Sequence, residues 1–178
     1  MTEPFAQMLA VGGRSNSLGR VDEVIALVSD EPSRLDELYA CLFDEDAWIR
    51  MRAADALEKV CRQHPEWLVP YVDRFPAELA GSSQPSILWH LAQMYRHLTL
   101  TSRQKAFAVS WLERVLSSTE VDWIVAANAM QTLMQFAEDG AVPRHELVAL
   151  LRVQQQHRSK SVVRRADKLL AQVGEASV

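Results

Sequence analysis

The five histidines and two cysteines are the side chains best suited to catalysis or metal binding. His90 and His97 lie seven residues apart and can share one flank of a helix, but no acidic residue stands at ligand spacing from them. The sequence has no HExxH, CxxC or GxSxG motif of the kind that zinc sites and serine hydrolases use. Cys41 and Cys61 fall in helical patterns and are expected to be buried thiols in a reducing compartment. We therefore predict no catalytic residue, no metal and no cofactor, and a protein that is not an enzyme.

The polar loop from Gly12 to Arg20 is a candidate anion site. Backbone amides of a glycine-rich loop that leads into a helix N-terminus can bind a phosphate or a carboxylate. The loop lacks the GxxxxGK[ST] pattern of a P-loop, and no strand precedes it. The alternative is a capping loop in which Asn16 or Ser17 caps the next helix. The candidate anion-binding residues are Gly12, Gly13, Arg14, Asn16 and Arg20.

Most of the chain consists of helical patterns that recur with a fixed period. Apolar residues at i, i+4, i+7, i+8 and i+11 mark one face of a helix whose pattern begins at Ile49. The same pattern begins again at Ile87, Val125 and Val162, so the period is 37 or 38 residues. A period in this range is typical of stacked helical repeats. Another helix precedes each of these, and since one pair cannot bury its apolar face alone, the pairs must stack.

The predicted fold is therefore an all-α, right-handed α-α superhelix of about four helical pairs with an N-terminal extension. We expect a single domain, 1–178, made of an extension and loop (1–18), stacked helical repeats (19–174) and a tail (175–178). Pro70 and Pro76 are expected to kink or split the helix that follows Pro65.

The sequence resembles HEAT repeats, which are relatives of armadillo repeats. The resemblance rests on Asp44-x5-Arg50, followed by Ala53 and Ala56-Leu57, which looks like the signature of the second helix of such a repeat. It implies that Asp44 and Arg50 bond to neighbouring repeats as a ladder, and that the chain is a scaffold or adaptor. A minority of HEAT-like proteins act on nucleic acid, including DNA glycosylases of the alkylpurine type. The chain is also similar to small prokaryotic HEAT-repeat proteins without an assigned activity.

The helical phase predicts a stripe on the second helix of each pair that faces away from the core. The resemblance implies that second helices line the concave face, so we predict that a protein or peptide binds there. Trp89 is the one tryptophan out of phase with the core, and exposed aromatic and arginine side chains favour binding. The alternative is a solvated surface with Trp89 covered by a neighbouring helix. The candidate partner-binding residues are Met51, Asp55, Glu58, Arg62, Trp89, Gln93, Arg96, Gln131, Met134, Arg164 and Lys168.

The distribution of charge limits the other classes of partner. The net charge of −4 combines an acidic segment, residues 1–140, with a basic one, residues 141–178. The acidic segment argues against broad nucleic-acid binding, and the basic end leaves room for weak, non-specific binding. No apolar run approaches the length of a membrane span, and no targeting segment is recognisable. We therefore expect a cytoplasmic protein that does not bind membranes.

Overall fold

The computed structural model describes residues 3–175, apart from the side chain of Glu175. Helices make up most of this range, and no strand occurs within it, which confirms the all-α class. The contacts divide the chain into two compact units, Met1–Thr99 and Leu100–Val178. Each unit is described by itself below, and one continuous superhelix through both stays a prediction.

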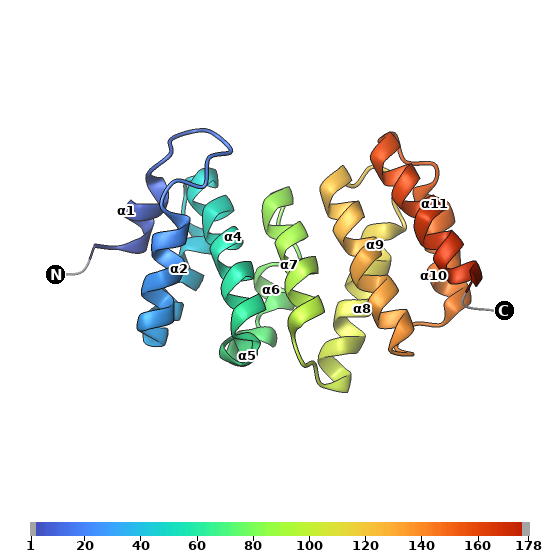
Figure 1. Cartoon of the computed structure of the whole chain (residues 1–178), viewed down its shortest axis with the longest axis horizontal. Coiled ribbons are helices and arrows are strands. Elements are labelled where there is room, and N and C mark those ends of the chain that lie inside the picture. The colour runs from blue at the N-terminus through green and yellow to red at the C-terminus, as the bar shows by residue number, and fades with distance from the viewer. Residues whose placement is uncertain (1–2, 176–178) are drawn as a thin grey trace. The chain divides into compact units, whose positions relative to one another are not determined.

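The first unit is built around one long helix, α4, which packs against α2 on one side and α7 on the other (Figure 1). Pro70 and Pro76 each stand in the first turn of a short helix, so the predicted split after Pro65 is confirmed. The helices of this unit are α1 (Phe5–Ala10), α2 (Val21–Asp30), α3 (Leu35–Ala40), α4 (Ala47–Gln63), α5 (Val69–Val72), α6 (Phe75–Glu78) and α7 (Pro85–His97), with 3-10 turns at Pro32–Arg34, Cys41–Phe43 and Pro65–Leu68.

Local sequence explains where α4 begins, where it ends and which side it buries. Asp46 is the N-cap, and its Oδ1 accepts a hydrogen bond from the amide of Trp48 at 2.7 Å. The helix ends at Gln63, two residues before Pro65. Ala53 and Ala56 are fully buried, and their small side chains permit the close approach of the flanking helices.

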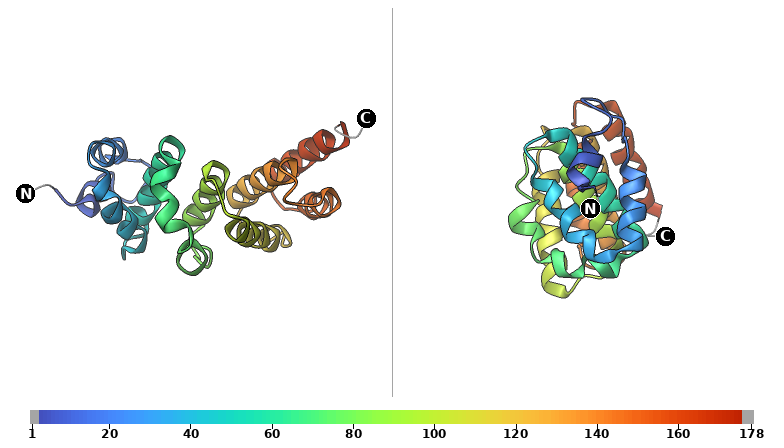
Figure 2. Two further views of the ribbon diagram at one scale, coloured as in Figure 1. Left: turned by 90° about the horizontal axis from the view of Figure 1, so that it is seen from below. Right: turned by 90° about the vertical axis from the view of Figure 1, so that its left-hand side faces the viewer.

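The second unit contains four helices in two layers, with α8 and α10 in one layer and α9 and α11 in the other (Figure 2). Its helices are α8 (Ser102–Leu116), α9 (Trp123–Glu138), α10 (Arg144–Gln154) and α11 (Lys160–Glu175). Thr101 and Gln104 form a capping box at the start of α8. Gln154 is fully buried, and its Nε2 donates to the carbonyl oxygens of Leu116 and Ser118 at 2.8 and 3.0 Å.

The predicted apolar faces of the second helices are the cores of the two units. Every position of the recurring pattern is buried except Leu170, which is half-buried. Helical periodicity therefore located the core correctly, because each face depends only on the order of residues within one helix.

Candidate functional site

A row of polar contacts crosses the layer of the first unit formed by α2, α4 and α7. Nζ of Lys59 lies 3.6 Å from Oδ1 of Asp22 and 2.9 Å from Oδ2 of Asp55. Oδ1 of Asp55 lies 3.8 Å from Nε2 of His90, and that nitrogen accepts a hydrogen bond from Nε1 of Trp89 at 3.1 Å. We call these five residues the polar row. It joins three helices at the surface opposite the α4 core.

His90 is neutral within the polar row. Its Nδ1 lies 2.7 Å from the carbonyl oxygen of Ser86 and donates to it, so Nε2 is the acceptor for the indole of Trp89. Burial lowers the pKa of His90 to about 4. The approach of His90 to Asp55 at 3.8 Å is therefore not an ion pair at neutral pH. The charge of Asp55 is instead balanced by Lys59.

Trp89 lies where the helical phase predicts it, on α7 and outside the core. It is half-buried, and the contact with His90 fixes the direction of its indole. Met51, Gln93 and Arg96 are also half-buried, and Arg62 is exposed. The amide oxygen of Gln93 is buried and accepts no hydrogen bond from the described residues.

Glu58 differs from the prediction, because it is buried rather than facing solvent. Its Oε1 lies 3.5 Å from Nε2 of His97 on α7, so the neighbouring helix covers it. Burial lowers the pKa of His97 below its usual value, although the nearby carboxylate of Glu58 opposes this shift.

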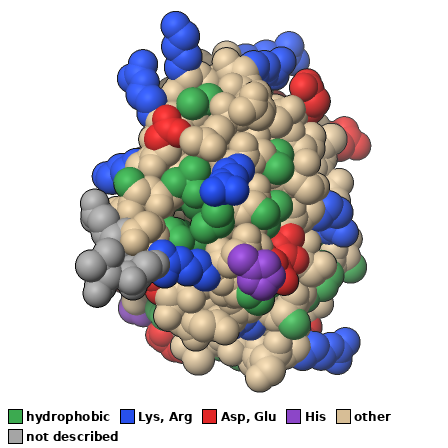
Figure 3. Space-filling model, turned by 90° about the vertical axis from the view of Figure 1, so that its right-hand side faces the viewer, with side chains coloured by type: hydrophobic (Ala, Val, Ile, Leu, Met, Phe, Trp, Pro, Cys, Tyr) green, Lys and Arg blue, Asp and Glu red, His purple; other side chains and the backbone are tan. Residues whose placement is uncertain are grey.

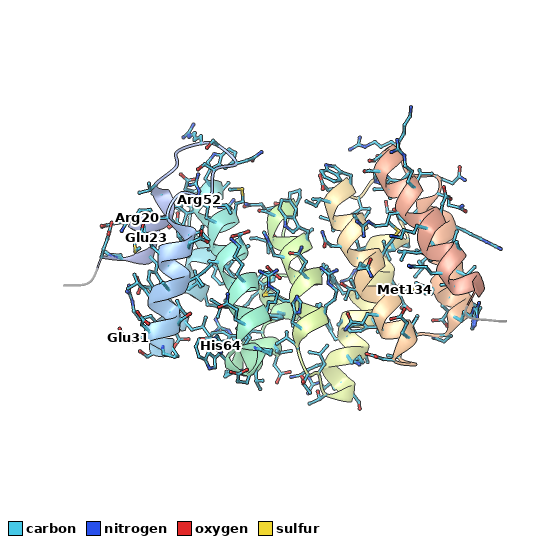
Figure 4. All side chains as sticks on the ribbon, in the orientation of Figure 1. Arg20, Glu23, Glu31, Arg52, His64 and Met134 are labelled. Carbon is cyan, nitrogen blue, oxygen red and sulfur yellow. The ribbon has the colours of Figure 1, made fainter. Side chains whose placement is uncertain are left out.

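The remaining candidate residues of the stripe lie in the second unit. Gln131 is half-buried on α9, and its Oε1 accepts a hydrogen bond from Arg165 at 3.3 Å. Met134 also differs from the prediction, because it is buried on α9, beside a pocket between α9, α10 and α11 (Figure 4). Arg164 and Lys168 are exposed on α11.

The loop from Gly12 to Arg20 is organised by a buried arginine that was not among the predicted site residues. Arg52 of α4 is fully buried and donates four hydrogen bonds to backbone carbonyls before and within this loop (Figure 4). The acceptors are the oxygens of Leu9 (2.8 Å), Gly13 (2.6 Å), Ser15 (3.2 Å) and Ser17 (2.8 Å). We call this arrangement the Arg52 cage.

The tight path of this loop explains its glycines. Gly19 has φ +55°, and an added Cβ would lie 1.9 Å from the carbonyl oxygen of Val11. The N-cap of α2 is Arg20, without a side-chain cap bond, so capping by Asn16 or Ser17 is wrong. The hydroxyl of Ser17 instead accepts a hydrogen bond from the amide of Gly19 at 3.2 Å.

Arg20, the last of the candidate anion-binding residues, already has carboxylate partners. Its guanidinium lies 2.9 Å from Glu3 and 2.9 Å from Glu23, and these hydrogen bonds raise its pKa further above its usual value. The hydrogen bond from Arg20 lowers the pKa of Glu23. Binding of an anion by this loop stays a prediction, and it now depends on the exposed side chain of Arg14 and on loop amides.

Arg50 bonds to the next helical pair, as the resemblance implied for a ladder. Its Nε donates to Oε1 of Gln84 at 2.7 Å, and its Nη1 donates to the carbonyl oxygens of Asp44 and Glu45 at 2.6 and 2.9 Å. Gln84 is the N-cap residue of α7. The partner of Arg50 in the next helical pair is therefore a side-chain amide, where the HEAT ladder would have an aspartate. The carboxylate of Asp44 stays within its own turn and accepts from the amide of Asp46 at 2.8 Å.

The two cysteines lack the features of nucleophiles. Both are buried free thiols, as predicted, and burial raises the pKa of Cys41 to about 11 and that of Cys61 to about 12. In the part of the chain that the structure describes, no group of three His, Cys, Asp or Glu side chains is placed to hold a metal ion. Among residues 3–175, no helix combines the length and the apolar character needed to cross a membrane.

Paired helices that stack in two layers define a helical-repeat protein of the α-solenoid class. Residues 13–88 match the family model of the HEAT repeat domain. This match confirms the resemblance to HEAT repeats that was predicted from Asp44 and Arg50. HEAT repeat domains generally serve as scaffolds for protein–protein interaction. No curated protein and no solved structure gives a significant match to the chain.

Proposed function

We propose that this chain is a non-enzymatic scaffold that binds a protein or peptide through the α2, α4 and α7 layer of its first unit. The observation that carries the proposal is the position of Trp89, half-buried on α7 and outside the core. A large aromatic side chain of low conformational entropy, surrounded by polar groups, is the usual centre of a protein-binding surface.

The charges near Trp89 also suit a surface that a partner covers. Covering an unpaired carboxylate is costly, but Asp55 is already balanced by Lys59 at 2.9 Å. His90 is neutral, and its hydrogen bonds to Ser86 and Trp89 are satisfied within α7. A partner can therefore cover this surface without isolating a charge.

The alternative, a nucleic-acid-directed HEAT protein of the DNA-glycosylase kind, has weaker support. Such an enzyme needs a carboxylate and aromatic side chains around an extruded base. Asp55 beside Trp89 is the grouping that most resembles this requirement. Its carboxylate is held by Lys59, so it is not available to a base without breaking that pair.

Site-specific photo-crosslinking tests the proposal. A photoreactive amino acid replaces Gln93 in the proposed surface or, in a control, the exposed Ala77 of α6. The chain is irradiated in lysate of the source cells, and crosslinked proteins are identified by mass spectrometry. We expect one specific partner from position 93 and none shared with position 77.

Two tryptophan variants complete this experiment. Trp89→Ala is expected to abolish the crosslink at position 93. Trp67→Ala is the matched control, because Trp67 is also half-buried in the first unit but stacks on His64, at 3.9 Å between ring centroids. Melting curves show whether each variant is folded. A folded Trp89→Ala protein that keeps its crosslinked partner would disprove a role for this surface.

A further inference from the structure

Helix α11 of the second unit carries several exposed cations that have no carboxylate partner. Several cations of the first unit are balanced by carboxylates: Arg20 by Glu3 and Glu23, Arg34 by Glu37, Lys59 by Asp55, and Arg74 by Glu78. Arg14 and Arg62 of that unit are exposed without an ion pair to a described residue, but they lie on different elements and form no line. On α11, Lys160, Arg164 and Lys168 are exposed and form no ion pair with any described residue. Arg165 reaches only the neutral amide of Gln131, at 3.3 Å.

These cations form a regular line along α11. Lys160, Arg164 and Lys168 are spaced i, i+4 and i+8, so neighbouring Cβ atoms are about 6 Å apart on one side of the helix. Gln172 continues the line one turn later and is also exposed. We call these four residues the basic track. It spans about 18 Å along the helix axis.

Helix electrostatics do not favour this placement. The N-terminal end of a helix carries partial positive charge and stabilises acidic side chains, yet the first turn of α11 contains none. The nearest carboxylate on the helix, that of Asp167, accepts a hydrogen bond from Nε2 of Gln155 at 2.6 Å and so points toward α10. The track therefore presents positive charge that neither its own helix nor its neighbours neutralise.

A pocket lined by apolar residues and by Glu138, Arg144 and Gln172 lies at the far end of the basic track. It has a volume of about 460 Å³ and lies between the end of α9, the start of α10 and the end of α11. Gln172 of the track is one of its lining residues, and Met134, Leu147 and Val173 supply buried apolar walls. Figure 3, which views the α10 and α11 side, shows Lys and Arg side chains along the upper edge and hydrophobic side chains toward the middle.

We propose that the basic track and this pocket together bind an acidic peptide segment that carries one large apolar side chain. The carboxylates lie along Lys160, Arg164 and Lys168, and the apolar side chain enters the pocket beside Met134. The inference rests on the proposed peptide-binding function and names the ligand class for the second unit. A track of about 18 Å accommodates about five or six residues of an extended peptide.

A peptide fits this site better than a nucleic acid does. Proteins that bind single strands combine a basic groove with aromatic side chains on which bases stack. The pocket is lined by Met134, Ala137, Glu138, Arg144, Leu147, Gln172 and Val173, and none of these is aromatic. Its apolar walls match an aliphatic side chain, which peptides have and nucleic acids lack.

Fluorescence anisotropy with the full chain tests this inference. The probes are labelled seven-residue peptides in which five Asp or Glu residues are followed by two identical residues, either leucine or serine. A labelled single-stranded oligonucleotide of equal charge is the comparison. We expect the leucine peptide to bind at least about tenfold more tightly than the serine peptide, since each tenfold corresponds to about 1.4 kcal/mol. We also expect it to bind more tightly than the oligonucleotide.

Two sets of variants locate the binding. Arg164→Glu with Lys168→Glu should weaken the leucine peptide about tenfold or more, because like charges then face each other. Arg103→Glu with Arg114→Glu makes the same change of charge on exposed positions of α8 and should leave binding unchanged. Ala137→Trp fills the pocket and should remove the difference between leucine and serine peptides.

Each contrary outcome overturns the inference. Equal binding of the leucine and serine peptides rules out the pocket, and tighter binding of the oligonucleotide reveals a nucleic-acid site. No binding of the leucine peptide at low salt, or equal loss in the α8 control, rules out the track. These measurements probe only the surface of the second unit. A negative result here therefore does not affect the proposed binding surface around Trp89, and a negative crosslinking result at position 93 does not affect the proposed peptide site on α11.

Discussion

The guanidinium of Arg52 donates from Nη1 to the carbonyl oxygen of Leu9 at 2.8 Å, across 43 positions of sequence. Three further bonds reach the carbonyl oxygens of Gly13, Ser15 and Ser17, and no described carboxylate balances this buried charge. A buried cation is tolerated only where its donors are satisfied. The Arg52 cage therefore holds the polar loop against α4, and the carbonyl oxygens at Leu9 and in the loop accept the hydrogen bonds of the buried guanidinium.

The first prediction is that Arg52→Met destabilises the protein by roughly 3–5 kcal/mol, because several carbonyl groups lose a charged donor at once. Arg52→Lys should recover only part of this loss, since an ammonium cannot reproduce the planar fork of a guanidinium. Urea unfolding followed by circular dichroism measures both values.

Arg62→Met is the control for this experiment, because Arg62 is an exposed arginine on the same helix. Its free energy of unfolding should stay within about 0.5 kcal/mol of the wild-type value. Equal urea midpoints for Arg52→Met and wild type would show that the cage contributes nothing to stability.

The second prediction concerns Arg50 and Gln84, which join α4 to the start of α7 at 2.7 Å. A double-mutant cycle with Arg50→Ala and Gln84→Ala should give a coupling energy of roughly 0.5–1.5 kcal/mol. The cycle is needed because Arg50→Ala also removes the donor to Asp44 and Glu45. A cycle of Arg50→Ala with the exposed Gln63→Ala should give no coupling, and equal couplings in both cycles would contradict a specific bond between the pairs.

The elements of the fold were predictable because their signals are local. The i, i+4, i+7 pattern that starts at Ile49 needs only the order of residues within one helix, and Pro70 and Pro76 act at their own positions. The position of Trp89 outside the core followed from the same phase. These features do not depend on which distant segments meet. The prediction that Trp89 is the one tryptophan out of phase with the core is wrong, because Trp123 at the start of α9 is 52% exposed.

Relationships between distant segments were not predictable from one sequence. Arg52 lies 35 to 43 residues from the carbonyls that it binds, and no periodicity connects an arginine with a loop backbone. The sequence offered one signal for this contact: Arg52 directly precedes the buried alanines of α4, and a glycine-rich loop occurs earlier in the chain. Glu58 was assigned to the exposed stripe because the phase of α4 alone cannot show that His97 of α7 covers it.

The third prediction is a loss of stability in mild acid caused by His90. Burial lowers its folded-state pKa to about 4, whereas an unfolded histidine has a pKa of about 6.5. Between pH 6.5 and 4, His90 therefore binds a proton in the unfolded chain but not in the folded chain. The free energy of unfolding consequently falls as the pH falls through this window, and the contribution of His90 is constant above pH 6.5. From pH 7 to pH 5, this contribution amounts to about 2 kcal/mol.

His90→Gln isolates this contribution, because glutamine keeps a polar side chain but does not titrate. Urea unfolding at several pH values from 7 to 5 should show a steeper decline for wild type than for the variant. The measured range, from pH 7 to 5, lies above the pKa values of ordinary carboxyl groups, so those groups add little to the difference. Parallel declines would mean that His90 is protonated in the folded chain and paired with Asp55, contrary to its neutral state in the polar row.

The last prediction concerns double-stranded DNA. The cations of α11 should give weak, non-specific binding at low salt, while residues 1–140, with 12 basic and 20 acidic side chains, repel the phosphate backbone. Counterion release makes such binding fall steeply with salt, so we expect a dissociation constant above about 10 μM near physiological ionic strength. Anisotropy titrations with a labelled duplex at several salt concentrations measure this dependence.

Arg164→Glu with Lys168→Glu should remove the residual binding at low salt, whereas Trp89→Ala should leave it unchanged, because Trp89 lies in the other unit. This separates a charge effect of α11 from recognition near the polar row. Sub-micromolar binding that depends on sequence or on a damaged base, and that Trp89→Ala abolishes, would instead favour the nucleic-acid alternative. In that case Asp55 would have to part from Lys59, and Asp55→Asn should then abolish processing of the base while leaving binding intact.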